Sequence, residues 1–415
     1  MKSILAINAG SSSVKISVYK AEFQQTPRQV AETQVNGLTA PPASLSYSRG
    51  GETVKKNEEL TQDIKSQDDA FKLLLKTLID DPNLPDIKSK DDIGITCHRI
   101  VHGGDYKSSQ LITQDTYHHL EELSDLAPLH NSPALAIVRS CIDQLPDAVN
   151  VACFDTQFHA DIPEHIRTYP INQEIAKKNH LRKYGFHGIS YSFITRSVAE
   201  FLGKDPSKLN IIALHLGSGA SACAIKNGKS YDTSMGLTPV AGLPGATRSG
   251  SVDPSLVFHY ASDVGKLSPA STADLHISRA EEILNKESGW KALTGTTDFG
   301  KISQSDDPAH KLAFDIFVDR ICGFIGTYFV SLRGEVDALV FAGGIGEKGA
   351  ELRRRVVDQV GCLGFALDGG LNGSKLDGVV KEVGRAEGTG RKTLVCHTDE
   401  QLEMAKLCAE NDALW

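Results

Sequence analysis

The sequence has no cysteine pair with CxxC spacing, no run of 18 apolar residues and no block of lysines or arginines. Scattered cysteines argue against a zinc cluster or a disulfide framework, and they indicate free thiols in a reducing compartment. Without a long apolar run the sequence offers no candidate membrane-spanning helix. A balance of 44 Lys and Arg against 52 Asp and Glu gives no positive patch for nucleic acid or an anionic membrane. We therefore expect a cytoplasmic protein with neither a nucleic-acid partner nor a membrane partner.

The chain is long enough for two domains, and it contains an internal repeat. Its 415 residues exceed what one ordinary hydrophobic core needs. Residues 4–11, ILAINAGS, align without a gap on residues 211–218, IIALHLGS, at an offset of 207 positions. Each copy has the pattern of a buried strand, a glycine–serine turn and a second strand. Two halves of like topology are predicted.

Strand-like runs alternate with helical patterns along the chain, which predicts α/β layers. The clearest runs are expected strands at 93–97 and 149–154 and expected helices at 70–79 and 311–333. Ser66 is expected to cap the helix at 70–79. The polar stretch 20–66 is expected to form exposed hairpins or loops.

Three glycine-rich segments each follow a short apolar strand. They are residues 8–13 (NAGSSS), 215–219 (HLGSG) and 342–347 (AGGIGE). Small residues at the end of a strand let backbone N–H groups approach a phosphate, and serine hydroxyls add donors. No Walker sequence, GxxxxGK[ST], is present. Together the three segments predict phosphate binding of a non-Walker type.

The glycine-rich segments belong to a longer series of motifs that resembles one known family. The series covers nearly the whole chain, and its motifs follow the family's order. The sequence resembles the acetate kinase family in the motifs NAGSSSVK (8–15), HRIVHGG (98–104), PLHN (128–131), FDTQFH (154–159), YGFHG (184–188), HLGSG (215–219), DTSMGLTPVAGL (232–243), TRSGSVDP (247–254), GGIGE (343–347) and TDE (398–400). Because several motifs are long, the match is specific.

The resemblance implies a fold and a reaction. The fold is two duplicated ribonuclease-H-like domains of the actin-like ATPase type with an interdomain nucleotide cleft, at residues 1–157 plus 398–415 and at residues 158–397. The reaction is reversible phosphoryl transfer from ATP to acetate by direct in-line attack, giving acetyl phosphate and ADP. Mg²⁺ is the implied cofactor, for which Mn²⁺ can substitute, and the implied assembly is a homodimer.

The chemistry of this reaction indicates which residue types are needed. Acetate is ionised at pH 7, because a carboxyl of this kind has a pKa near about 4.3, so it needs no strong base to become a nucleophile. The obstacle is repulsion between acetate and a polyanion, and fixed cations and N–H donors offset it. By resemblance, Arg99, Arg248 and His187 surround the reacting groups. Asp155 follows an expected strand, and magnesium placement or electrostatic organisation is its expected role, although a base is the role named for the family.

The remaining site residues are assigned by resemblance. The apolar cup for the acetate methyl, beside the substrate contact Arg99, consists of Val101, Leu129, Phe186 and Pro239. Magnesium is expected at Asn8 and Glu400. The nucleotide site consists of Lys15, Ser11, Ser13, His215, Leu216, Gly217, Ser218, Gly219, Asp298, Phe299, Gly300, Gly343, Gly344, Ile345, Gly346 and Glu347.

Four departures from the family pattern leave alternatives open. Ser218 stands in place of Asn, Gly245-Ala246 in place of Met-Gly, Gly300 in place of Arg and Lys348 in place of Asn. These changes affect nucleotide affinity and the phosphoryl donor more than the acetate chemistry. A propionate- or butyrate-preferring kinase and a pyrophosphate-linked kinase therefore stay open, as does an ATP-driven chaperone or filament protein of the same superfamily.

Overall fold

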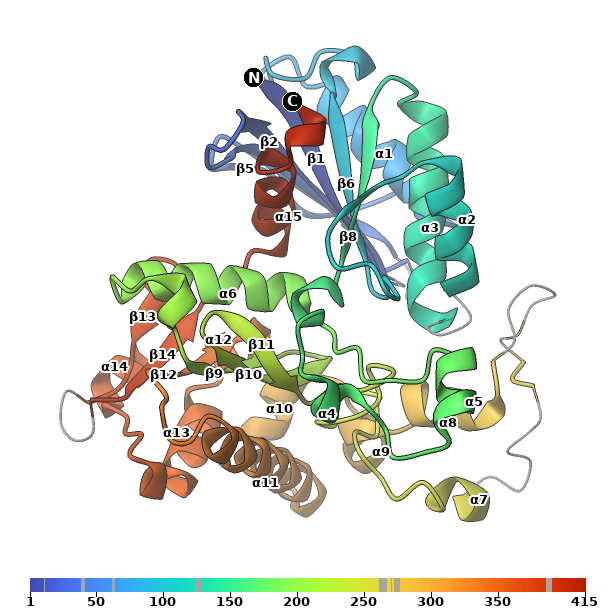
Figure 1. Ribbon diagram of the computed structural model, residues 1–415. Coiled ribbons are helices and arrows are strands. Elements are labelled where there is room, and N and C mark those ends of the chain that lie inside the picture. The colour runs from blue at the N-terminus through green and yellow to red at the C-terminus, as the bar shows by residue number, and fades with distance from the viewer. Residues whose placement is uncertain are drawn as a thin grey trace. The chain divides into compact units, whose positions relative to one another are not determined.

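The chain folds into two compact units. The computed structural model describes residues 1–10, 12–38, 42–61, 64–123, 128–260, 267–269, 271, 277–385 and 390–415, and it leaves the side chains of residues 128–130 out. The N-terminal unit comprises Met1–Gln157 together with Asp399–Trp415, and the second unit comprises Phe158–Thr398. The last residues of the chain therefore belong to the unit that contains the first ones (Figure 1).

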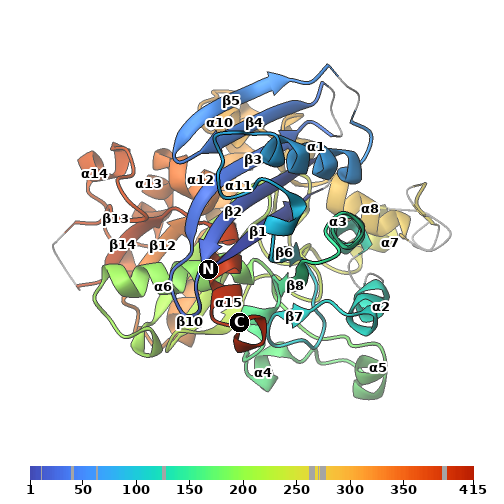
Figure 2. The same cartoon turned by 90° about the horizontal axis from the view of Figure 1, so that it is seen from above.

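The N-terminal unit is built on an eight-stranded mixed sheet with the order β5-β4-β3-β2-β1-β6-β8-β7 (Figure 2). Its strands are β1 (Lys2–Ala9), β2 (Ser13–Ala21), β3 (Arg28–Asn36), β4 (Ser44–Arg49), β5 (Glu52–Glu59), β6 (Ile95–Ile100), β7 (Gln110–Leu111) and β8 (Val149–Phe154). Strand β6 runs parallel to both β1 and β8, whereas the other neighbours are antiparallel.

Helices cover both faces of this sheet. They are α1 (Gln67–Ile79), α2 (Gln114–Leu123), α3 (Pro128–Gln144) and α15 (Glu400–Ala409), with short 3₁₀ turns at Lys90–Asp92, Gln157–His159 and Asp412–Leu414. The predicted helix at 70–79 is confirmed, and Ser66 caps it by accepting a hydrogen bond from the backbone N–H of Asp69 at 3.1 Å. Helices α1 and α3 pack on one face and α15 on the other (Figure 1).

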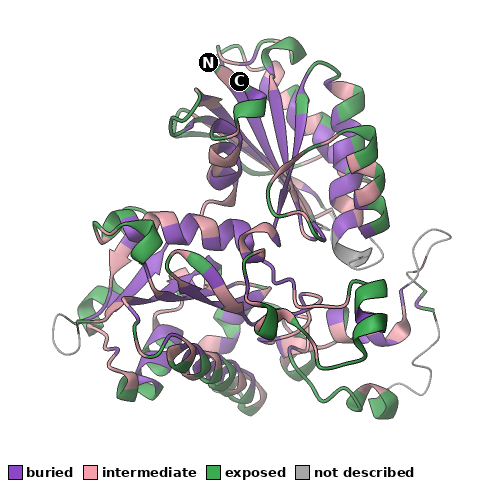
Figure 3. Cartoon of the chain, in the orientation of Figure 1, coloured by how far each residue is buried: buried purple, intermediate pink, exposed green. Residues whose placement is uncertain are grey.

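The second unit is built on a six-stranded sheet with the order β11-β10-β9-β12-β14-β13. Its strands are β9 (Ile211–Leu216), β10 (Ala220–Lys226), β11 (Lys229–Thr233), β12 (Ala338–Ala342), β13 (Val380–Glu382) and β14 (Lys392–Cys396). Its helices are α4 (Glu164–Arg167), α5 (Gln173–Lys178), α6 (Gly188–Phe201), α7 (Leu256–Tyr260), α8 (Arg279–Lys286), α9 (Gly289–Thr294), α10 (Phe299–Ser303), α11 (Pro308–Ser331), α12 (Gly343–Lys348), α13 (Ala350–Gln359) and α14 (Gly369–Gly373), with 3₁₀ turns at Pro206–Lys208 and Gly361–Leu363. The strands are buried between these layers (Figure 3).

The two sheets share one topology, as the repeat predicts. The order β3-β2-β1-β6-β8 in the first corresponds to β11-β10-β9-β12-β14 in the second, with antiparallel pairs followed by parallel pairs. The aligned segments 4–11 and 211–218 fall on the matching strands β1 and β9. The α/β fold with a duplicated core is therefore confirmed.

Two expectations for local structure need correction. The stretch 20–66 does form hairpins, since β3 pairs antiparallel with β4 and β4 with β5. It is not exposed throughout, because β3 and β4 extend the sheet and bury residues such as Val35 and Tyr47. Polar residues on the other side of these two strands hid this burial. The GGIGE segment is the short helix α12 rather than a turn.

Cysteine burial and helix hydropathy agree with the opening expectations where the structure describes them. All eight cysteines are free thiols, and seven of them are buried, Cys362 being the exposed one. Among the described residues, no helix is long and apolar enough to cross a membrane.

A buried polar cluster joins β6 to β8. His98 Nε2 donates a hydrogen bond to Asn150 Oδ1 at 3.0 Å, and Thr96 Oγ1 donates to the same oxygen at 2.7 Å. Burial lowers the pKa of His98 to about 4, although the bond to Asn150 opposes the shift. His98 is therefore neutral in the folded protein across the range in which it titrates when unfolded.

We expect His98 to make the protein less stable in acid. Because the folded pKa lies below the unfolded value of about 6.5, the unfolded state binds more protons between about pH 6.5 and 4. Stability falls as the pH falls through that window, by up to about 1.4 kcal/mol per pH unit from this residue. Urea unfolding at pH 7, 6 and 5 should give a flatter pH slope for His98→Gln than for wild type. Equal slopes for the two proteins would contradict the assignment.

Candidate active site

The functional side chains of the N-terminal unit gather where its parallel strands end. Asn8 lies near the end of β1, Arg99 near the end of β6, and Asp155 directly after β8, while Glu400 opens helix α15. Arg99 donates from Nε to Asp155 Oδ1 at 3.0 Å and from Nη2 to Asp155 Oδ2 at 2.7 Å. Its Nη1 lies 3.4 Å from Asn8 Oδ1 and 3.5 Å from Glu400 Oε2. One guanidinium therefore joins the three strands and the C-terminal helix.

This arrangement fixes the charge of Arg99 and limits the chemistry of Asp155. Burial would lower the pKa of Arg99, but the charges of Asp155 and Glu400 and the hydrogen bonds to Asp155 raise it above its ordinary value. The Asp155 side chain is 1% exposed and receives two hydrogen bonds from the guanidinium. A carboxylate held in this way is a poor proton acceptor, so the geometry favours an electrostatic role.

The same cluster has the donor set that magnesium prefers. Asn8, Asp155 and Glu400 supply amide and carboxylate oxygens, and the two carboxylates outweigh the single charge of Arg99. No group of three His, Cys, Asp or Glu side chains able to hold a metal occurs in the described part of the chain. The set therefore fits Mg²⁺ that keeps several waters and shares phosphate oxygens, rather than a metal held by protein ligands alone.

Lys15 and Ser13 lie on β2, the strand that pairs with β1 beside this cluster. Lys15 pairs with Asn8 in the β1–β2 register, and its Nζ lies 2.9 Å from Glu32 Oε2. Ser13 opens β2, and its carbonyl accepts a hydrogen bond from the N–H of Gly10. Ser11 lies outside the described residues. The structure therefore shows Lys15 paired with Glu32, and its contact with a phosphate stays a prediction.

In the second unit, Arg248 packs against the HLGSG segment. A Cβ atom built on Gly219 would collide with Arg248 Nη2 and lie 3.6 Å from His187 Nε2. A side chain at 219 would therefore displace the Arg248 guanidinium from its place against the turn, whereas His187 lies at ordinary contact distance. Leu216 belongs to the core, whereas Gly217 and Ser218 form the turn.

Two of the four departures from the family pattern contact each other. The N–H of Ala246 donates to the carbonyl of Ser218 at 2.8 Å, and a Cβ atom on Gly245 would lie 2.7 Å from that carbonyl. The loop before Arg248 thus fits the turn only with a glycine at 245.

His187 lies beside Arg248 and His215. It is the N-terminal cap residue of α6, with a left-handed backbone at φ 59°, and its ring lies 4.2 Å from the ring of His215. Its Nδ1 lies 2.8 Å from Ser221 Oγ. The two histidine rings and Arg248 therefore form one basic group at the end of β9.

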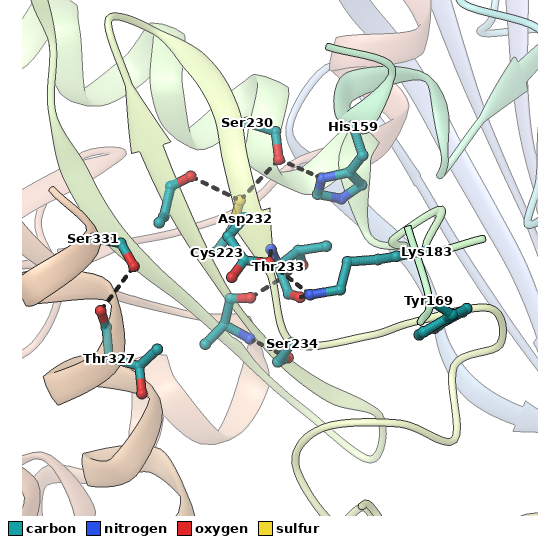
Figure 4. Close-up of polar contacts among 12 residues, drawn as sticks. His159, Tyr169, Lys183, Cys223, Ser230, Asp232, Thr233, Ser234, Thr327 and Ser331 are labelled. Atoms are coloured by element: carbon teal, nitrogen blue, oxygen red, sulfur yellow. Dashed lines mark hydrogen bonds and ion pairs between the residues drawn. The ribbon is translucent and has the colours of Figure 1, made fainter. Parts of the chain in front are cut away.

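A buried histidine supports the turn that carries Phe186 and His187. His159 Nε2 donates to the carbonyl of Phe186 at 2.9 Å. On the other side of the ring, its Nδ1 lies 2.7 Å from Ser230 Oγ (Figure 4). Burial, the largest influence, lowers the pKa of His159 to about 4, so it is neutral at pH 7. In the sequence His159 appears only as the last residue of the FDTQFH motif, which does not indicate this role.

The predicted acetate cup is divided between the two units. Val101 is half-buried in the N-terminal unit, whereas Phe186 and Pro239 are buried in the second unit. The side chain of Leu129 lies outside the described set. The cup therefore stays a prediction.

The segment 342–347 packs directly on the HLGSG segment. Strands β9 and β12 are parallel, with Ala342 opposite His215. Gly343 has φ +74°, and a Cβ atom there would lie 2.7 Å from the carbonyl of Leu216. From Gly343 the chain enters α12, which carries Gly344, Ile345 and Gly346. Glu347, in the same helix, accepts from the Thr398 N–H at 3.4 Å and lies 2.6 Å from His397 Nδ1.

The predicted nucleotide residues 298–300 lie at the start of α10. Asp298 caps this helix by accepting from the N–H groups of Gly300 and Lys301. Phe299 is a core residue, packed against Trp290 and Phe317, so only its backbone is open to a ligand. The structure shows a capping role for Asp298 and places Gly300 at an exposed position.

The sequence reasoning missed Arg353, a buried arginine that holds α12. Arg353 is 3% exposed and donates to the carbonyls of Gly346 at 2.6 Å and Glu347 at 2.8 Å, and to Asn372 Oδ1 at 2.7 Å. Burial lowers its pKa to about 10, so it is still charged at pH 7. The sequence signal for its burial was its position on the apolar stripe of α13, three residues before Val356.

Duplicated α/β sheets that end in glycine-rich segments, carboxylates and fixed arginines define a phosphoryl-transfer enzyme of the two-domain α/β class. Comparison with known proteins makes this specific. The model of the acetokinase family matches residues 3–406. A probable acetate kinase of Chaetomium globosum is 64% identical, with 99% of this chain and 98% of that protein covered. An acetate kinase of Campylobacter concisus is 36% identical, with 97% and 96% covered.

Comparison with solved structures agrees with the family that the sequence comparison gives. The crystal structure of Porphyromonas gingivalis acetate kinase is similar at a TM-score of 0.81, with 33% identity and 98% of each chain covered. That of a propionate kinase from Francisella tularensis gives 0.84, with 32% identity and coverage of 98% and 99%. The chain belongs to the acetokinase family. It is a kinase that transfers phosphate to a carboxylate, and its family implies ATP and acetate as small-molecule substrates.

Replacing Arg353 should destabilise the second unit strongly. Arg353→Met would leave the carbonyls of Gly346 and Glu347 in α12 without their hydrogen-bond donor. Removing a buried charged partner of this kind lowers the free energy of unfolding by about 3 kcal/mol or more. Arg354→Met is the matched control, because Arg354 is exposed and pairs only with Glu351 and Asp358 on its own helix. Denaturant unfolding should show a lower midpoint for Arg353→Met alone. If the two variants unfold alike, Arg353 does not hold α12.

Proposed function

We propose that this chain is a Mg²⁺-dependent acetate kinase that transfers the phosphoryl group of ATP to acetate by direct in-line attack. The observation that supports it best is Arg248 lying against Gly219 beside His187, at the ends of the strands that carry the two glycine-rich segments. A cation and a ring N–H fixed at this point suit the charge that develops on a transferring phosphoryl group.

The residues of the N-terminal unit have a matching task. Acetate needs no general base, and Asp155 is engaged by Arg99, so Asp155 and Arg99 orient one another and set the charge around Asn8 and Glu400. Mg²⁺ held through Asn8, Glu400 and Asp155 would neutralise phosphate oxygens. Arg99, with one edge of its guanidinium anchored on Asp155, keeps a fixed direction for binding a carboxylate or phosphate oxygen.

ATP is the proposed donor. The support is the retained helix α12, which is packed on the HLGSG segment and held by Arg353. A pyrophosphate-linked kinase would have no use for an adenine site, so the donor can be tested directly. Among acceptors, one methylene is worth about 1 to 3 kcal/mol, so propionate should be a poorer but real substrate.

The deciding experiment is a hydroxamate-coupled assay with the purified protein. Acetyl phosphate should form with ATP and Mg²⁺ in an acetate-dependent way, and pyrophosphate should not replace ATP. ATP turnover that ignores acetate would instead point to a chaperone-like ATPase. Higher kcat/KM with propionate or butyrate than with acetate would move the assignment to another short-chain acyl kinase.

We also propose a homodimer in a reducing compartment such as the cytoplasm. Helix α7 exposes Phe258 by 71% and Tyr260 by 61%, which is costly for a single chain in water. The free thiols suit a reducing environment. Light scattering should give twice the monomer mass of 44.8 kDa, and a monomer would refute the dimer.

Arg248→Ala should lower kcat by about 10³-fold or more, because an arginine at the transferring phosphoryl group contributes about 10³ to 10⁵ in rate. The fold should persist, since Arg248 is not part of the hydrophobic core. Arg320→Ala, at an exposed arginine paired with its neighbour Asp319, should keep wild-type kinetics. A loss below tenfold for Arg248→Ala would remove this residue from the transition state.

Asp155→Asn should lower kcat and raise the Mg²⁺ concentration needed for half-maximal activity, because one of the two carboxylates near Asn8 is lost. Activity measured from low to high Mg²⁺ should recover in part at high concentration. Proton abstraction by Asp155 would instead give a loss that Mg²⁺ does not relieve. Circular dichroism would check that the variant is folded.

A further inference from the structure

Behind His187 lies a short chain of buried hydroxyl groups. His187 Nδ1 lies 2.8 Å from Ser221 Oγ, and Ser221 Oγ lies 2.6 Å from the hydroxyl of Tyr191. Ser221 and Tyr191 are fully buried, and His187 is 8% exposed. Tyr191 lies one turn after His187 in α6, and Ser221 lies opposite His215 in β10. Helix and sheet are therefore joined by a hydrogen-bonded path that ends on the histidine ring.

The direction of the protons along this path follows from the neighbours of Tyr191. Burial raises the pKa of Tyr191 well above its ordinary value, so the phenol keeps its proton. A backbone hydrogen bond from His215 also reaches its oxygen and opposes that shift, as a donated bond does. The phenol proton still needs an acceptor of its own, and Ser221 Oγ at 2.6 Å supplies one. Ser221 then has one proton left, and the remaining neighbour is His187 Nδ1.

The other ring nitrogen faces the site. A Cβ atom on Gly219 would lie 3.6 Å from His187 Nε2 and against Arg248 Nη2, so both nitrogens approach the same point. Arg248, the tilted ring of His215 and the phenol of Tyr191 are charged or titratable groups that lie near the His187 ring. A second positive charge beside Arg248 would be repelled, whereas a neutral N–H would not.

We propose that Tyr191 and Ser221 are positioning residues that keep His187 neutral with its proton on Nε2. His187 then donates a hydrogen bond to the same oxygen that Arg248 contacts, and it cannot accept a proton there. The identity of that oxygen, on a phosphoryl or a carboxylate group, rests on the proposed function. The position of the proton on the His187 ring does not rest on the proposed function.

Nuclear magnetic resonance of protein labelled with ¹⁵N-histidine tests the ring directly. The chain has 14 histidines, so the spectrum of His187→Gln identifies the signals of His187. At pH 7.5, about one unit above the ordinary histidine pKa, we expect a proton on Nε2 of His187 and none on its Nδ1. Ser221→Thr, which keeps the hydroxyl, should give the same pattern, and Ser221→Ala should lose it. A proton on Nδ1 in the wild type, alone or on both nitrogens, would overturn the proposal.

Kinetics test the consequence. Tyr191→Phe and Ser221→Ala should each lower kcat about 5- to 10-fold, the effect of one lost hydrogen bond, with the KM for ATP within about twofold. Tyr328→Phe is the matched control, because Tyr328 is as buried and its hydroxyl has no hydrogen-bond partner. It should keep wild-type kcat. Equal losses in Tyr191→Phe and Tyr328→Phe, or a loss in Ser221→Thr as large as in Ser221→Ala, would refute a positioning role.

The two proposals fail in different ways. A wild-type protein without acetate-dependent ATP turnover would refute the proposed function and leave the observed state of His187 standing. An active enzyme whose His187 carries its proton on Nδ1 would refute the positioning role of Tyr191 and Ser221 and leave the proposed function intact.

Discussion

Parallel pairing of the central strands is the constraint on which the rest of the structure depends. In the N-terminal unit β1, β6 and β8 run the same way, so Asn8, Arg99 and Asp155 reach one edge of the sheet. In the second unit β9 and β12 do the same for the HLGSG segment and α12. Because the carboxyl ends of parallel strands meet at one edge, each duplicated unit can gather residues that are far apart in sequence. Chemistry then differs between the units through the side chains at these ends.

The two clusters of functional side chains, one in each unit, differ in charge. In the N-terminal unit the cation Arg99 is flanked by two carboxylates, so the cluster as a whole is acidic. In the second unit Arg248 lies against Gly219 beside two histidine rings. The acidic cluster suits a divalent cation, and the basic group suits phosphate or carboxylate oxygens. A net charge of −8 for the chain says nothing of this division.

Much of the fold and part of the site could be predicted from the sequence. The repeat at 4–11 and 211–218 gave the duplicated topology, and the apolar spacing gave α1 and α11. The grouping of Asn8, Arg99 and Glu400 rested on resemblance, since 300 residues separate members of one cluster and no local pattern links them. The burial of β3 and β4 was missed because polar residues line the exposed side of these strands. Arg353, Tyr191 and Ser221 were missed because a polar residue in an apolar stripe reads as an interruption until its partner is known.

Helix α15 gives the N-terminal unit a particular history during synthesis. It comes from the end of the chain, packs on β1, β2, β6 and β8, and is tied back by Gln401 to the carbonyl of Ala6. Residues 158–398 are made without interruption and contain every strand of their own sheet. On the ribosome the second unit can therefore fold while one face of the first sheet is still bare. A chain released before residue 400 would lack Glu400 and expose that apolar face to chaperones and proteases.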